Sequence, residues 1–136
     1  MNAMNNPAAS RFEQGQARFE SVTGIPAELF AASLEDVAPR FARYVMEWEF
    51  GDMLGESILG SRSREIVAIT SMAMLGASAA PILKLRIGTA LKAGVSRQEI
   101  IDIFIQLAIS AGFPLALAAI HVAKEKFTEL DAGAGE

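Results

Sequence analysis

Few side chains in this sequence can take part in chemistry, because the chain contains one histidine, His121, and no cysteine. Without cysteine there are no disulfides, no thiolate metal sites and no thiol redox reactions. A lone histidine cannot build an imidazole metal site, and no carboxylates lie at ligand spacing from it. His121 could carry a proton near neutral pH, or it could lie on a polar helix face with Lys124 and Glu125. We expect neither a metal nor an organic cofactor.

Arg86 lies in the middle of a mostly apolar segment. A guanidinium is always charged and can grip a carboxylate through two parallel hydrogen bonds, so Arg86 is a candidate anion clamp in a pocket. The alternatives are a salt bridge between helices or subunits, or a side chain that extends along apolar surface to reach water.

Glu47 and Trp48 are the next candidates. Glu47 follows Arg43 by four residues, which is the spacing of a surface ion pair on a helix, and it could also act as a general acid or base. Trp48 could form the wall of a pocket or pack in the core.

The hydrophobic pattern has helical periodicity throughout, and strand alternation is not evident anywhere in the chain. These residues are therefore expected to lie on helices. A capping box, Ser96 to Glu99, precedes one of the expected helices, and Ser61 is placed to cap another. Residues 51–60 are expected to form a loop, and Phe41, Tyr44, Val45 and Trp48 are expected to form a core face. The predicted helices cover residues 7–22, 26–32, 39–52, 62–77, 80–93, 100–111 and 114–130. The sequence therefore predicts an all-α single domain over residues 1–136, with 1–32 as an N-terminal arm and 131–136 as a frayed tail.

Composition limits the partners. Of the 136 residues, 51% are hydrophobic and 21% are charged, which is more apolar surface than a small monomer can hide, so we expect a homo-oligomer. Asp102, Gln106 and Ser110 form one narrow polar stripe on an otherwise apolar helix, as expected for a subunit interface or the centre of a bundle. A net charge of −4 without a basic run argues against nucleic acid.

Two further observations concern location. The polar N-terminus does not have the pattern of a signal peptide, so the cytoplasm is the expected compartment. Residues 100–123 are almost long and apolar enough to span a membrane. However, Asp102, Gln106 and His121 interrupt this stretch, and Gly112 to Pro114 break it, so two packed helices are expected instead.

Several segments together resemble one family. They are EWEFGD (47–52), SREIVAIT (63–70), ALKAGVSRQEIIDI (90–103), QLAISAGFPLALAA (106–119) and VAKEKF (122–127). In this order and spacing, from about Phe41 to Phe127, the chain resembles the carboxymuconolactone decarboxylase family, within the wider alkylhydroperoxidase D-like group. The resemblance implies an alkylhydroperoxidase D-like helical bundle that assembles as a trimer or hexamer. It also implies decarboxylation of 4-carboxymuconolactone to an enol-lactone.

The resemblance also suggests which residues form the site. Arg86 stands where the family has its proposed catalytic His, and Gly88 stands where the family has an Arg. Arg64 matches a family Arg at a helix start, and Glu47 matches a Glu upstream of the family's Phe-Gly. The Cys-x-x-Cys pair of the peroxidase branch is replaced by Ala79 and Ile82, so peroxide reduction by that route is excluded.

The leading hypothesis is a cofactor-independent decarboxylase that acts on a small anionic lactone or unsaturated acid in aromatic-compound catabolism. Its expected catalytic residues are Arg86, Glu47 and His121, and its expected substrate-binding residues are Arg64 and Trp48. The alternatives are a catalytically silent oligomeric binding or scaffold protein, and a lyase or isomerase acting on a different small acid.

Overall fold

The computed structural model describes residues 3–5 and 8–134, and every element in those ranges is helical. The all-α prediction is therefore confirmed for this part of the chain. It divides into two compact units, residues 1–58 and 59–136. The expectation of a single domain over 1–136 stays a prediction.

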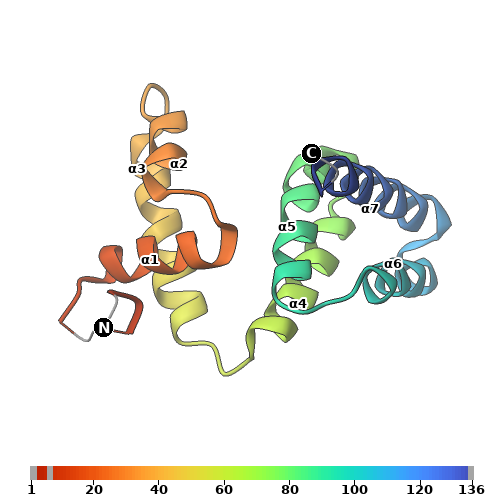
Figure 1. Ribbon diagram of the computed structural model, residues 1–136, viewed down its shortest axis with the longest axis horizontal. Coiled ribbons are helices and arrows are strands. Elements are labelled where there is room, and N and C mark those ends of the chain that lie inside the picture. The colour runs from red at the N-terminus through yellow and green to blue at the C-terminus, as the bar shows by residue number, and fades with distance from the viewer. Residues whose placement is uncertain (1–2, 6–7, 135–136) are drawn as a thin grey trace. The chain divides into compact units, whose positions relative to one another are not determined.

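The first unit is built on one long helix with two shorter helices packed around it. After a short turn of helix, η1 (Ala3–Asn5), come α1 (Arg11–Thr23) and α2 (Ala27–Leu34). Then α3 (Pro39–Tyr44) runs directly into the π-helical segment η2 (Val45–Met53), and α1 crosses this continuous helix (Figure 1). The core of this unit contains Phe19, Ala27, Met46 and Phe50. Residues of the expected arm are therefore packed into a small core.

The contact between α1 and η2 depends on a glycine. A Cβ atom added to Gly15 would lie 1.8 Å from the carbonyl oxygen of Met46, so the two backbones can approach this closely only without a side chain. At its ends, α1 is fixed by the Ser10 side chain, which accepts from the N–H of Glu13, and by Gly24 at φ 74°.

The predicted core face of the long helix was wrong for three of its four residues, because only Val45 packs against the core. Phe41, Tyr44 and Trp48 are 58%, 42% and 57% exposed, whereas Ala42, Met46 and Phe50 are buried. The buried residues recur every four positions, and the π-helical turns from Val45 onward are wider than those of an α-helix. Both this set and the aromatic set recur at helical spacing, so periodicity alone did not decide which face is buried. The helix also continues into the expected loop, because η2 ends at Met53 and a further helical turn covers 54–55.

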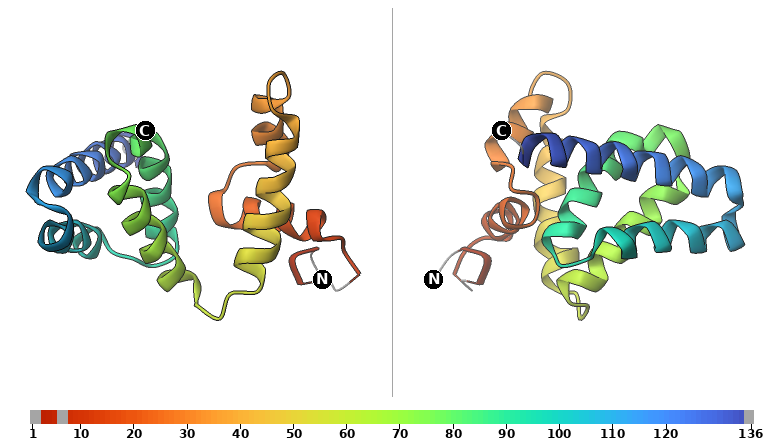
Figure 2. Two further views of the ribbon diagram at one scale, coloured as in Figure 1. Left: turned by 180° about the vertical axis from the view of Figure 1, so that it is seen from behind. Right: turned by 45° about the vertical axis from the view of Figure 1, so that its right-hand side comes forward.

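The second unit is a bundle of four main helices. These are α4 (Ser61–Met74), α5 (Ala80–Lys92), α6 (Arg97–Ala111) and α7 (Phe113–Ala134), with a short 3₁₀ turn, η3 (Gly76–Ala79), between the first two. In the two views of Figure 2, α6 and α7 lie side by side, and α4 packs against α5. The fully buried large side chains of this core are Ile69, Ile87, Val95, Ile100 and Phe104.

Most helix boundaries of this unit follow the predicted signals. Ser96 and Glu99 form the expected capping box of α6, and Gly112 at φ 94° separates α6 from α7. Ser61 does not cap α4, because Gly60 occupies the cap position without a side-chain bond. Helix α7 continues to Ala134, so most of the expected tail 131–136 is helical, and residues 135–136 lie outside the described ranges. Pro7, the expected start of the first helix, also lies outside them.

The break between α6 and α7 divides the apolar stretch 100–123 into two helices. None of their helices is both long enough and apolar enough to cross a bilayer.

Candidate functional site

Arg86 on α5 forms a largely buried polar cluster with Glu65 on α4 and Thr89 on α5. Its Nη2 atom lies 3.5 Å from Oε1 of Glu65 on α4. The Thr89 hydroxyl, one turn further along α5, donates to Oε2 of the same carboxylate at 2.6 Å, with the Arg86 carbonyl 2.9 Å away as a second acceptor. The side chains of Arg86 and Glu65 are 13% and 6% exposed. Both carboxylate oxygens are therefore occupied within the protein.

The Arg86 guanidinium has more hydrogen-bonding groups without a partner in the described residues than the Glu65 carboxylate has. Glu65 is its one ion-pair partner among the described residues, and this contact involves a single nitrogen. No side-chain nitrogen or oxygen in the described part of the chain is both buried and without a hydrogen-bond partner. The remaining nitrogens of Arg86 consequently reach the surface, where a guanidinium can still donate to an anion.

This arrangement can hold a carboxylate beside an internal acid. Arg86 can donate two parallel hydrogen bonds, and Glu65 with Thr89 restricts the orientation of the guanidinium. The sequence interpretation missed Glu65, although it lies within the segment 63–70 that carries the resemblance. Its spacing from Ile69 and Ala73, at i+4 and i+8, was the available signal, because an acid on a buried helix face needs a partner.

Arg64 is placed next to Glu65 in the first turn of α4, and it makes a backbone contact. Its Nη1 atom donates to the carbonyl oxygen of Leu59 at 2.8 Å, which fixes the chain where it enters the helix. Its expected role in anion binding stays a prediction.

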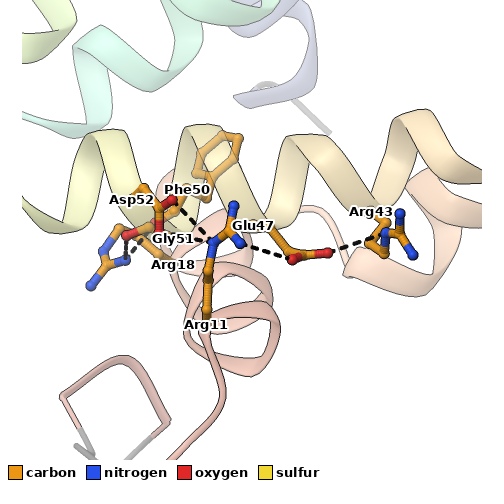
Figure 3. A network of polar contacts seen from close by, with 7 residues as sticks. All are labelled: Arg11, Arg18, Arg43, Glu47, Phe50, Gly51 and Asp52. Atoms are coloured by element: carbon orange, nitrogen blue, oxygen red, sulfur yellow. Dashed lines mark hydrogen bonds and ion pairs between the residues drawn. The ribbon is translucent and has the colours of Figure 1, made fainter.

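Glu47 is held by two arginines in the first unit (Figure 3). Its Oε1 atom lies 3.2 Å from Nε of Arg43, which confirms the predicted i,i+4 pair, and its Oε2 atom lies 3.3 Å from Nη1 of Arg11. Arg11 also pairs with Asp52 at 3.0 Å. Beside this network, Arg18 donates to the carbonyl oxygens of Phe50 and Gly51.

Trp48 does not pack in the core, contrary to the alternative considered for it. The Arg11 guanidinium lies 5.8 Å from the centre of its exposed ring, which is within the range of a cation–π contact. Glu47 and Trp48 belong to the first unit, whereas Arg64, Arg86 and His121 belong to the second.

His121 lies on the outward face of α7. It is exposed, as are Leu117 four residues before it and Lys124 three residues after it, while Ala119 and Ala123 face the core. Within this unit the described contacts do not join His121 to Arg86. The expected role of His121 as a proton carrier stays a prediction.

The polar stripe on α6 is exposed on the same unit. Asp102 and Gln106 lie on the surface, where the Gln106 amide donates to the Asp102 carboxylate at 3.5 Å. The expected pairing of these two residues across a subunit interface stays a prediction.

Surface ion pairs fasten α7 to its neighbours. The ammonium of Lys84 on α5 lies 2.7 Å from Glu125 and 2.8 Å from Glu129, and these two carboxylates raise the pKa of the lysine. Arg97 on α6 makes two hydrogen bonds to Asp131, which raise the pKa of the arginine and lower that of the aspartate. The pKa of Glu99 is lowered by two hydrogen bonds that its carboxylate accepts. The larger effect comes from the backbone N–H of Ser96 and the smaller one from the side chain of Arg62. These surface contacts link α5 and α6 to α7, and α4 to α6.

In the described ranges, His, Asp and Glu side chains do not gather in any group of three or more that could hold a metal ion. The chain also has no cysteine.

Comparison with known proteins gave three matches. Residues 39–125 match the sequence profile of the carboxymuconolactone decarboxylase family. A 4-carboxymuconolactone decarboxylase of Acinetobacter baylyi is 24% identical over 121 residues, covering 88% of this chain and 89% of that protein. An uncharacterized 15.0 kDa protein from the nqo9-nqo10 intergenic region of Paracoccus denitrificans is 26% identical over 99 residues, covering 73% of this chain and 74% of the other.

Proposed function

The chain belongs to the carboxymuconolactone decarboxylase family, and from that premise we propose that it is a cofactor-independent decarboxylase of a small anionic lactone or unsaturated acid. The observation that carries the proposal is the Arg86–Glu65–Thr89 cluster, in which a nearly buried guanidinium keeps donors free at the surface. The similarity to the Acinetobacter baylyi enzyme supports 4-carboxymuconolactone as the first substrate to test, in the context of aromatic-compound catabolism.

In the proposed reaction, Arg86 binds a carboxylate of the substrate through its free N–H groups. The bond between the ring carbon and the departing carboxyl group breaks, CO2 leaves, and the electron pair moves into the conjugated lactone carbonyl. A fixed positive charge stabilises the enolate-like charge that develops there. Glu65 and Thr89 act as positioning residues, because they orient the guanidinium before the substrate arrives.

One proton must then reach the substrate carbon. An arginine side chain stays protonated in proteins, so Arg86 is not its source. Glu47, His121 and water are the donors that we propose to compare, with Arg64 and Trp48 as proposed contributors to substrate binding.

The test is an incubation of the purified protein with 4-carboxymuconolactone, in which ultraviolet absorbance and released CO2 are followed together. We expect the absorbance of the lactone to change as one CO2 is released for each molecule consumed. No turnover at high enzyme concentration would remove this substrate from the proposal.

A silent oligomeric binding or scaffold protein is the second candidate function. The observation that favours it is the pairing of Arg86 with Glu65, because an internal carboxylate already neutralises the guanidinium. A protein of this kind would bind small carboxylates without releasing CO2, so the same incubation distinguishes the two functions.

A further inference from the structure

The first unit contains a cavity that lies apart from the Arg86–Glu65–Thr89 cluster, the observation that carries the decarboxylase proposal. It has a volume of about 300 Å³ and opens between α1, α2 and the long helix formed by α3 and η2. Phe12, Ala31, Ala42 and Met46 supply much of its apolar wall. Alanines stand where α2 and α3 face each other, so the space between these helices is not filled. Its size falls at the lower end of the range for ligand pockets, so a small molecule is the appropriate occupant.

Polar groups occur at only a few places along this wall. They are the guanidinium of Arg43, the carboxylate of Glu47 and the amide of Gln16. Both oxygens of Glu47 are already engaged, one by Arg43 and one by Arg11. The carboxylate is therefore poorly placed to accept from a ligand.

The Arg43 guanidinium, in contrast, still has N–H groups available for a ligand. It contacts Glu47 through Nε at 3.2 Å and makes no other ion pair among the described residues, while its guanidinium lies 5.2 Å from the centre of the Tyr44 ring. Its two terminal NH2 groups are free, and together they fit the two oxygens of a carboxylate. Gln16 is half-buried and has no hydrogen-bond partner among the described residues, so its amide can donate a further bond.

We propose that this cavity binds a small monocarboxylic acid with a compact apolar body, such as an aromatic acid. The body lies among Phe12, Ala31, Ala42 and Met46, and the carboxylate receives hydrogen bonds from Arg43 and Gln16. The proposal does not depend on the decarboxylase activity, because Arg86 and Glu65 belong to the other unit.

The test measures binding of benzoate to the full chain by isothermal titration calorimetry. Benzoate is expected to bind one molecule per chain, and neutral benzyl alcohol is expected to bind about tenfold or more weakly, because a hydrogen-bonded charge is lost. Arg43→Gln should weaken benzoate binding by about ten- to a hundredfold and leave the affinity for benzyl alcohol nearly unchanged.

Two further variants separate the cavity from general charge effects. Ala31→Leu fills the cavity without altering any charge and should abolish binding of both probes. Arg40→Gln removes the same charge from an exposed arginine of the same helix that does not line the cavity, and it should bind benzoate like the wild-type protein. Thermal unfolding of each variant confirms that it is folded.

The proposal is overturned if benzoate does not bind at millimolar concentration, or if Arg43→Gln and Ala31→Leu bind it as well as the wild type does. It is also overturned if Arg86→Ala alone abolishes benzoate binding, since the acid then binds in the second unit. A failure to decarboxylate 4-carboxymuconolactone leaves these binding measurements unaffected, so failures of the two proposals can be distinguished.

Discussion

The pairing of Arg86 with Glu65 places two opposite charges where little water reaches them. Removing ions from water is costly, and the attraction between them repays this cost only when the remaining hydrogen bonds are also made. Thr89 supplies one such bond to Glu65, while part of the guanidinium still meets solvent. A pair of this kind adds little net stability, which is consistent with a group retained for binding an anion.

Arg86→Met is expected to lower the free energy of unfolding by about 3–5 kcal/mol, because the buried Glu65 carboxylate loses its charged partner. The double variant Arg86→Met with Glu65→Gln should recover most of this loss, since no unpaired charge remains. Urea denaturation followed by circular dichroism measures both. A single variant as stable as the wild type would show that the pair is not buried in solution.

Residue-scale prediction from the sequence succeeded for local pairs and failed for tertiary ones. The ion pair of Arg43 with Glu47 follows from spacing along one helix, and it is present. The partner of Arg86 lies 21 positions away on another helix, and which acid meets it depends on how α4 packs on α5. The exposure of Trp48 likewise depends on which face of the long helix packs against α1.

At the scale of elements, the sequence predicted the order and type of the helices because capping and turn residues act locally. Ser96 with Glu99 and the break at Gly112 are examples. The π-helical stretch could not be predicted, because its wider turns leave no periodic signal that differs clearly from an α-helix. Gly15 in turn shows how closely α1 packs on that stretch.

Gly15→Ala is expected to destabilise the first unit by about 1–3 kcal/mol or more, because its Cβ would overlap the Met46 carbonyl and force α1 away from η2. Gly133→Ala is the matched control, since this helical glycine has open space around it and should gain at most about 1 kcal/mol. Thermal unfolding compares the two. Equal stability of both variants would contradict the close packing of α1 on η2.

The capping box of α6 predicts a dependence of stability on pH. The pKa of Glu99 is lowered below its ordinary value of 4.5 by the N–H of Ser96 and by Arg62, so Glu99 stabilises the fold above that pH. This contribution is lost as the pH falls through the lowered pKa of the folded state.

Glu99→Gln should therefore be less stable than the wild type at neutral pH, with a difference that shrinks as the pH falls below 4.5 and through the lowered pKa of the folded state. Urea denaturation at a series of pH values measures this, with the exposed Glu35→Gln as the control. A difference that is the same at every pH would mean that the charge of Glu99 does not matter.

At the scale of the whole molecule, the apolar side chains that remain exposed are the main feature. In the second unit Ile109 and Phe113, at the junction of α6 and α7, are 84% and 80% exposed, with Leu117 nearby on α7. Large apolar groups clustered at one place on a surface indicate a contact with another molecule. The sequence predicted an oligomer from its apolar composition, from the polar stripe on residues 100–111 and from the family resemblance, and the structure identifies where the exposed apolar groups lie.

We expect sedimentation equilibrium to show three or six chains per particle. Ile109→Glu should shift the protein toward smaller species, because a charge would be buried in the contact. Val37→Glu, at an exposed apolar position of the first unit, is the control and should leave the assembly unchanged. A wild-type protein that sediments as a monomer at micromolar concentration would contradict the expected assembly.

The most direct test of the proposed function is the rate of CO2 release from 4-carboxymuconolactone by the wild-type protein, Arg86→Ala and Arg97→Ala. Arg97 is an exposed arginine paired with Asp131, so its variant removes the same charge away from the cluster. We predict that Arg86→Ala lowers kcat/KM by about a hundredfold or more, while Arg97→Ala stays within about twofold of the wild type. A folded Arg86→Ala variant that releases CO2 as fast as the wild type would contradict the central role of Arg86.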